Sequence, residues 1–176
     1  MNRILVVIDM QNDFITGSLG TKEAEAIVSN VADKIRSYRE KHFRVFATKD
    51  THYSDTYLTT QEGKKLPVLH CIKDTDGWRF PEELEELISP TEIWNKESFG
   101  SLRAMEAIAQ VAKKTNAVVE FCGLCTDICV IENVALLKTI DPELEIEVDS
   151  SCCAGVTPEK HNAALEIMRS LQVKVF

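Results

Sequence analysis

The sequence lacks a long apolar run near its beginning. The first apolar stretch covers residues 4–8 and is followed directly by Asp9. This stretch is too short for the apolar core of a signal peptide and for a membrane-spanning helix. We therefore expect a cytoplasmic protein that has no membrane partner.

Basic residues are also scarce, with 20 Lys and Arg against 28 Asp and Glu and a net charge of −8. Nucleic acid is bound mainly through cationic surface, so we expect no nucleic-acid partner. Aromatic residues make up only 7%, but 44% of the 176 residues are hydrophobic, which is enough for an ordinary core and excludes disordered and collagen-like classes. The length predicts a single domain over residues 1–176.

Six cysteines are present, at positions 71, 122, 125, 129, 152 and 153. In a chain without a secretory signal, thiols stay reduced, and clustered cysteines more often indicate chemistry or metal binding than a disulfide framework.

Strand and helix patterns alternate along the chain. Apolar or alternating runs predict strands at residues 3–8, 43–48, 92–94, 117–121, 144–148 and 173–176. Helical spacing or helix-start residues predict helices from Thr21 to residues 39–42, at 81–88, at 102–113, from Thr126 or Asp127 to 137, and after Thr157. Residues 49–81 keep neither period, and loops of that length are usually functional. The repeated β-α pattern predicts a single-domain three-layer α/β/α fold with a mainly parallel sheet of about six strands.

Candidate site residues follow the predicted strands. Ligands of such sheets bind beyond the carboxyl ends of the strands, where Asp9, Asp50, Lys96 and residues 123–129 lie. Taken singly, Asp9 could be an ordinary turn residue and Lys96 an ordinary surface lysine.

The segment around residues 121–130 carries the strongest chemical signal. A strand, a glycine turn and a helix start bring backbone N–H groups together, and a cysteine in the first helical turn has a lowered pKa. Cys129 has that place. Two alternatives stay open: the cysteines could be small buried hydrophobes, or Cys122 and Cys125 could form a dithiol redox motif.

A second group has the residue types of a metal site. Asp50 and His52 share one side of an extended segment, and His70 follows a loop containing Pro67. Two histidines and a carboxylate leave coordination positions open, which is typical of catalytic metals. Solvated loop residues are the alternative. His42 and His161 show no such spacing, and we expect surface or helix positions for them.

Together these residues resemble the isochorismatase-like cysteine hydrolases and, within them, the nicotinamidases. The resemblance spans nearly the whole chain. Its motifs are IDMQNDF at 8–14, D-x-H at 50–52, LPxxHC at 66–71, KxxF at 96–99, GLCTDxCV at 123–130, DSSC at 149–152 and PExH at 158–161.

The resemblance implies roles for particular residues. It makes Asp9, Lys96 and Cys129 the catalytic residues, with Lys96 favouring the thiolate, and Phe14 a substrate contact. It also implies a cis peptide bond at 124–125 and an oxyanion hole made by the backbone amides of Cys125 and Cys129. The metal ligands that it implies are Asp50, His52 and His70, holding a divalent ion, for which we expect zinc, with iron or manganese as alternatives.

The expected activity is hydrolysis of a small amide through a thioester, with nicotinamide converted to nicotinate in pyridine nucleotide salvage, by a homo-oligomer. A metal-free hydrolase of a carbamoyl or ureido compound is the alternative within the family. Two departures bear on the substrate: residues 53–57 lack the additional histidine of some nicotinamidases, and only Pro67 remains of the usual proline pair.

Overall fold

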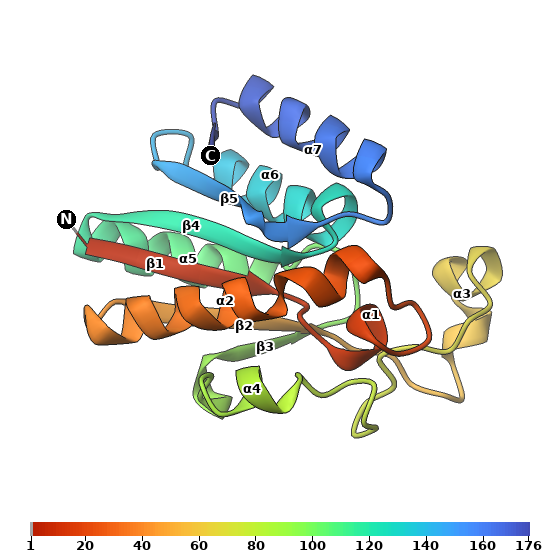
Figure 1. Cartoon of the computed structure of the whole chain (residues 1–176). Coiled ribbons are helices and arrows are strands. Elements are labelled where there is room, and N and C mark those ends of the chain that lie inside the picture. Colours follow the sequence, from red (N-terminus) through yellow and green to blue (C-terminus); the bar gives the residue numbers. More distant parts are fainter. Residues whose placement is uncertain (1) are drawn as a thin grey trace.

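The computed structural model describes residues 2–176 and contains one six-stranded sheet in the order β3-β2-β1-β4-β5-β6 (Figure 1). Every neighbouring pair of strands is parallel. The strands are β1 (Asn2–Ile8), β2 (Arg44–Asp50), β3 (Ile93–Lys96), β4 (Ala117–Leu124), β5 (Ile146–Ala154) and β6 (Lys174–Val175). The predicted α/β class with a parallel six-stranded sheet is confirmed.

Helices cover both faces of the sheet. They are α1 (Asn12–Ile15), α2 (Lys22–Glu40), α3 (Gln61–Lys65), α4 (Glu82–Glu85), α5 (Leu102–Thr115), α6 (Ile131–Ile140) and α7 (Pro158–Ser170). One face is covered by α2, which packs across β1, β2, β4 and β5. On the opposite face α5 packs on β1 and β4, and α6 lies between α5 and α7.

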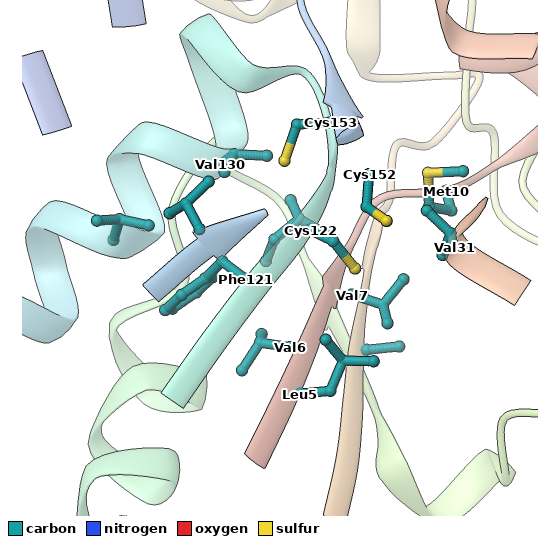
Figure 2. Close-up of a cluster of buried hydrophobic side chains, with 14 of the residues drawn as sticks. Leu5, Val6, Val7, Met10, Val31, Phe121, Cys122, Val130, Cys152 and Cys153 are labelled. Atoms are coloured by element: carbon teal, nitrogen blue, oxygen red, sulfur yellow. The ribbon is translucent and has the colours of Figure 1, made fainter. Parts of the chain in front are cut away.

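The core lies on both sides of β1 and β4. Residues Ile4 to Ile8 of β1 are each at most 1% exposed, because β1 pairs on both sides and is covered on both faces. In Figure 2, Val7 lies on the side of Val31 from α2, whereas Phe121 of β4 lies on the side of Val130. This double burial explains why the sequence of β1 is continuously apolar rather than alternating.

Two differences between the structure and the expectations concern segments near the site, while β5 is longer and α4 shorter than expected. Residues 49–81 are not simply a loop, since they contain a 3₁₀ turn (Tyr57–Thr59) and α3, which projects from the body of the molecule in Figure 1. The helix expected to begin with a Thr126 or Asp127 cap instead begins after Cys125, as a π-helical turn (Thr126–Val130) that leads into α6.

Gly123 is required where β4 passes the end of β1. Its φ is +117°, and a Cβ at this position would lie 2.1 Å from the carbonyl oxygen of Ile8. Only glycine fits such a conformation and such an approach. Among residues 2–176, no helix has the length and apolar character needed to cross a membrane.

Candidate active site

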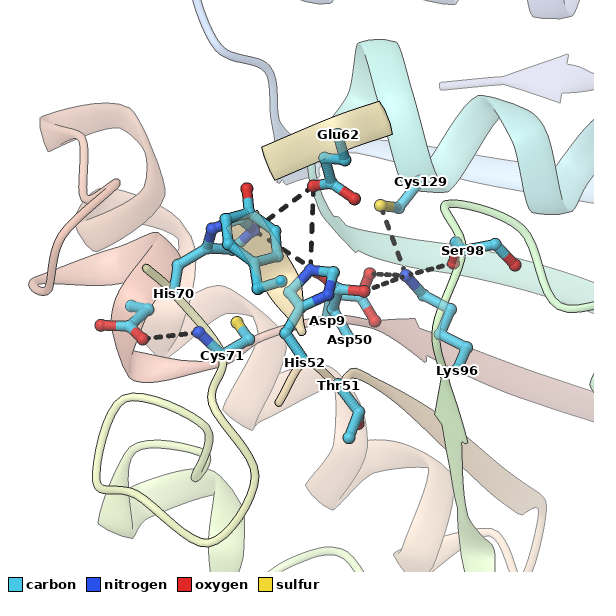
Figure 3. Close-up of polar contacts among 12 residues, drawn as sticks. Asp9, Asp50, Thr51, His52, Glu62, His70, Cys71, Lys96, Ser98 and Cys129 are labelled. Atoms are coloured by element: carbon cyan, nitrogen blue, oxygen red, sulfur yellow. Dashed lines mark hydrogen bonds and ion pairs between the residues drawn. The ribbon is translucent and has the colours of Figure 1, made fainter. Parts of the chain in front are cut away.

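The carboxyl ends of β1, β2, β3 and β4 bring the predicted residues together. Asp9 directly follows β1, Asp50 is the last residue of β2, Lys96 is the last residue of β3, and Cys129 lies in the turn after β4. Figure 3 shows the four side chains converging on one point. All four are at most 5% exposed.

Asp9 and Lys96 form a buried ion pair. The Nζ of Lys96 lies 2.7 Å from Oδ2 of Asp9. The hydroxyl of Thr48, from β2, donates a 2.7 Å hydrogen bond to the other carboxylate oxygen of Asp9. Asp9 itself has a φ of +47°, a left-handed conformation that aspartate tolerates better than most residues.

Lys96 also reaches the cysteine. Its Nζ lies 3.5 Å from Sγ of Cys129 and donates a 3.1 Å hydrogen bond to the carbonyl oxygen of Ser98. The buried amide of Asn133 ties the two segments together, since it donates to the carbonyl oxygens of Cys129 and Phe99. Cys129 is therefore held against the Lys96–Asp9 pair by contacts from both sides.

The electrostatics of this group differ from the expectation. Burial raises the pKa of the Cys129 thiol well above its ordinary value, and the Asp9 carboxylate raises it further, against the opposite effect of Lys96. Burial likewise raises the pKa of Asp9, although Lys96 lowers it. The expected lowering of the Cys129 pKa is thus wrong for the free enzyme. Both shifts favour the protonated form of the group concerned.

A second cluster lies beside the first. Asp50, His52, Glu62 and His70 each offer one nitrogen or oxygen, and these four atoms all lie within 4.8 Å of one another. The Nε2 of His52 is 3.0 Å from Oδ2 of Asp50, and the Nε2 of His70 is 3.5 Å from Oε1 of Glu62 (Figure 3).

This cluster fits a divalent metal ion. His52 Nε2 is buried and lies near Asp50 without making a hydrogen bond of suitable geometry, so a ligand would satisfy it. Nδ1 of His70 lies 2.8 Å from the carbonyl oxygen of Val68, a contact that fixes the ring and leaves Nε2 facing the cluster. Burial alone would raise the pKa of Asp50, but His52 and Lys96 lower it below its ordinary value, so this ligand stays ionised.

Glu62 is the member of the cluster that the sequence interpretation missed. It comes from α3, which is capped by the Thr60 side chain accepting a hydrogen bond from the Gly63 amide. A Cβ on Gly63 would lie 2.1 Å from the carbonyl oxygen of Tyr57, so glycine lets α3 pack on the preceding turn. The cap and the glycine were visible in the sequence, but the fold-back that brings Glu62 to the histidines was not.

Cys129 and the four residues of the second cluster line one cavity of about 690 Å³, and Lys96 and Asp9 lie next to Cys129 without lining it. Asp50, His52, His70, Cys125 and Cys129 lie along its polar part. Apolar side chains form much of its wall, and they include the predicted substrate contact Phe14, with Leu66, Phe99, Leu124, Ile128 and Val156. A cavity of this size with a few convergent polar groups is typical of a small-molecule site.

Residues of the cysteine turn also line this cavity. The peptide bond between Leu124 and Cys125 is cis, as expected. The carbonyl oxygen of Cys125 accepts hydrogen bonds from the amides of Ile128 and Val130, and these bonds flank the amide of Cys129.

The environment of the C-x-x-C motif does not favour redox chemistry. Cys122 is fully buried in β4, and burial raises its thiol pKa well above the ordinary value. Burial and Asp127 raise the pKa of Cys125 to about 12. Dithiol redox motifs depend on an accessible thiol of lowered pKa, and neither cysteine provides one.

Comparison with known proteins fits this arrangement. The model of the isochorismatase domain family matches residues 3–176. The chain belongs to this family. A curated nicotinamidase/pyrazinamidase of Mycobacterium tuberculosis is 26% identical over 184 residues, which cover 98% of this chain and 97% of that protein. The expected family and its nicotinamidase branch are therefore confirmed.

Solved structures extend the comparison. The crystal structure of a pyrazinamidase of Pyrococcus horikoshii in complex with zinc is 26% identical, covers 100% of this chain and 99% of its own, and has a TM-score of 0.79. An N-carbamoylsarcosine amidase from Thermoplasma acidophilum is 24% identical, with a TM-score of 0.77 and coverage of 99% and 95%. The second likeness concerns the fold alone, so the fold does not select the substrate.

Proposed function

We propose that this enzyme hydrolyses nicotinamide to nicotinate and ammonia, with Cys129 as the nucleophile. One observation carries the proposal: Cys129, which lies against the Lys96–Asp9 ion pair, lines the same cavity as the Asp50–His52–Glu62–His70 cluster. The first group supplies a nucleophile with a base, and the second supplies ligands for an ion beside it.

Formation of the acyl-enzyme begins with proton transfer. Asp9 accepts the Cys129 thiol proton as sulfur attacks the amide carbonyl, and Lys96 stabilises the negative charge of the sulfur and carboxylate. The raised pKa of both groups favours transfer during attack over a standing thiolate. The backbone amides of Cys125 and Cys129 bind the oxyanion, and each such donor can contribute about 3–4 kcal/mol to the transition state.

Collapse of the tetrahedral intermediate breaks the carbon–nitrogen bond. Asp9 gives its proton to the departing nitrogen, ammonia leaves, and the acyl group remains on Cys129 as a thioester. Asp9 then accepts a proton from an attacking water, the thioester breaks, and the proton returns to the Cys129 sulfur with release of the acid.

The metal ligands in this proposal are Asp50, His52, Glu62 and His70, and zinc is the expected ion, with iron or manganese as alternatives. When bound, the ion supplies a Lewis-acid contact for the pyridine nitrogen of the substrate. Phe14 lies against the His70 ring, with ring centroids 5.6 Å apart, and offers a face on which the pyridine can rest.

A release assay for ammonia tests the substrate. The panel comprises nicotinamide, pyrazinamide and small carbamoyl and ureido compounds, each with metal-loaded protein. We expect release from nicotinamide and pyrazinamide. Release from the carbamoyl or ureido compounds alone, unchanged by a chelator, would contradict the proposal in favour of the metal-free alternative. The homo-oligomer and the cytoplasmic location stay predictions.

A further inference from the structure

His161 contacts the cysteine turn through Thr126. It lies near the start of α7, and its Nδ1 is 2.8 Å from Oγ1 of Thr126. Thr126 is fully buried and directly follows Cys125. His161 is absent from the residues that line the cavity in the described part of the chain, so it can act on the reaction only through its neighbours.

The start of α7 holds the same turn at further points. The amide of Val156 donates a 2.9 Å hydrogen bond to Oδ1 of Asp127. A Cβ on Gly155 would lie 2.7 Å from that oxygen and 2.9 Å from the Cβ of His161. This close packing leaves the imidazole little freedom to leave Thr126.

The hydrogen bond suits a neutral ring. Burial lowers the pKa of His161, although the nearby Asp127 opposes this shift. In the neutral form with the proton on Nε2, Nδ1 accepts from the Thr126 hydroxyl. The hydroxyl is thereby fixed in one rotamer, and the backbone of the turn is fixed with it.

We propose that His161 is a positioning residue: through Thr126 it holds the turn from Cys125 to Cys129 so that the backbone amides of these cysteines point at the substrate oxyanion. This inference rests on the amide hydrolysis proposed above. Because His161 contacts Thr126 and not the sulfur of Cys129, its loss should weaken stabilisation of the oxyanion and leave the reactivity of the sulfur unchanged.

A matched pair of variants tests the role. His161→Asn places an amide atom near the position of Nδ1 and can keep the contact with Thr126, whereas His161→Leu fills the space without a polar atom. In His161→Leu we expect kcat for nicotinamide to fall by about tenfold or more, as for partial loss of an oxyanion donor, with KM close to the wild-type value. His161→Asn should recover most of the loss.

Two further readouts separate positioning from general damage. The aldehyde carbon of pyridine-3-carbaldehyde can be attacked by the Cys129 sulfur, which gives an oxyanion-like adduct. Binding of this aldehyde should weaken in His161→Leu in parallel with the fall in kcat. Alkylation of Cys129 by iodoacetamide, which forms no oxyanion, should proceed at the wild-type rate. A structural defect that displaced Cys129 would slow both reactions.

A double-mutant cycle with Thr126→Val, which removes the hydroxyl and keeps the shape, completes the test. The double variant His161→Leu/Thr126→Val should be no slower than the slower single variant. Wild-type kcat in His161→Leu, additive losses in the cycle, no recovery in His161→Asn, or equal slowing of alkylation would each overturn the inference. Absence of amide hydrolysis by the wild-type protein would instead overturn the proposed function itself.

Discussion

Buried charges lie on two parts of the sheet: around Glu120 on the face covered by α2, and around Asp9 and Lys96 at the carboxyl edge. The carboxyl groups of these two parts differ in the direction of their pKa shifts. On the α2 face, Glu120 of β4 binds Lys34 at 2.5 Å and Arg3 at 2.8 Å, and accepts a hydrogen bond from Tyr38. Asp149 of β5 also binds Lys34, at 2.6 Å. We call these residues, with Glu147, the α2-face network.

The pKa of the Asp9 carboxyl group shifts in the opposite direction to those of Asp149 and Glu147. Burial would raise the pKa of Asp149, but Lys34 and Ser151 lower it below its ordinary value, and Lys174 and Arg3 do the same for Glu147. At the carboxyl edge of the sheet, burial prevails over Lys96 and the pKa of Asp9 is raised. Fully partnered carboxylates such as Asp149 therefore stabilise the fold, whereas Asp9, beside Lys96 and Cys129, is suited to take up and release a proton.

The largest expected effect is on catalysis and comes from Asp9→Asn. The amide keeps the shape of the side chain but cannot accept the thiol proton, so we expect kcat/KM for nicotinamide to fall by at least about 10³-fold. The free energy of unfolding should change little, because the raised pKa of Asp9 means that its ionised form does not stabilise the fold, and Lys96 keeps its contacts with Asp50 and Ser98. Steady-state kinetics and urea unfolding measure the two effects.

Asp149→Asn in the α2-face network is the matched control. This variant should keep the kcat of the wild-type protein, whereas its free energy of unfolding should fall. Substantial activity in Asp9→Asn would show that another group is the base.

The next effect is on stability and comes from Glu120→Gln. This change leaves Lys34 and Arg3 without their shared buried carboxylate, and removal of one partner from a buried ion pair typically costs about 3–5 kcal/mol. Urea unfolding should detect it, and the kcat of the folded protein should remain at the wild-type value. Glu145→Gln, at an exposed position nearby, should change stability by no more than about 0.5 kcal/mol.

Glu62→Gln should weaken metal binding. The change removes a negative charge from the four-residue cluster and keeps the size of the side chain, so we expect metal affinity to fall at least about tenfold. Competition with a chelator measures the affinity, and iodoacetamide should still alkylate Cys129. Glu86→Gln, an exposed change on the surface, is the control. Equal affinity in Glu62→Gln and wild type would remove Glu62 from the ligand set.

The smallest expected effect is the pH dependence of stability. Asp149 and Glu147 have folded-state pKa values below their unfolded values, so their contribution is present above the unfolded pKa and is lost as pH falls through the folded pKa. Urea midpoints should therefore fall on acidification below about pH 4, the unfolded carboxyl range. The fall should be smaller in Asp149→Asn, and an identical fall in both proteins would contradict the assignment.

The sequence predicted the residues whose positions depend only on strand ends. Asp9, Asp50 and Lys96 follow recognisable apolar runs, and parallel strands end at one edge of a sheet, so their convergence could be anticipated. Glu62 could not be placed, because residues 49–81 have no period that reveals how α3 folds back. The helix start and Lys96, which the sequence shows, predict a lowered pKa for Cys129, whereas the burial of the thiol beside Asp9, which raises this pKa, depends on the fold.

The contact made by His161 likewise could not be predicted from the sequence. It was expected at a surface or helix position, and it does lie in α7, but its contact with Thr126 joins residues 35 positions apart in the sequence. Such a contact depends on the packing of α7 against the cysteine turn, which no local pattern reports.

The most direct test of Cys129 as the nucleophile compares ammonia release from nicotinamide by the variants Cys129→Ala and Cys125→Ala with that of the wild-type protein. Cys129 is assigned the nucleophilic sulfur, whereas Cys125 contributes only its backbone amide, so their side chains should differ completely in importance. We predict no detectable release by Cys129→Ala and a rate near that of wild type for Cys125→Ala, with both proteins folded. An active Cys129→Ala together with an inactive Cys125→Ala would contradict the assignment of Cys129 as the nucleophile.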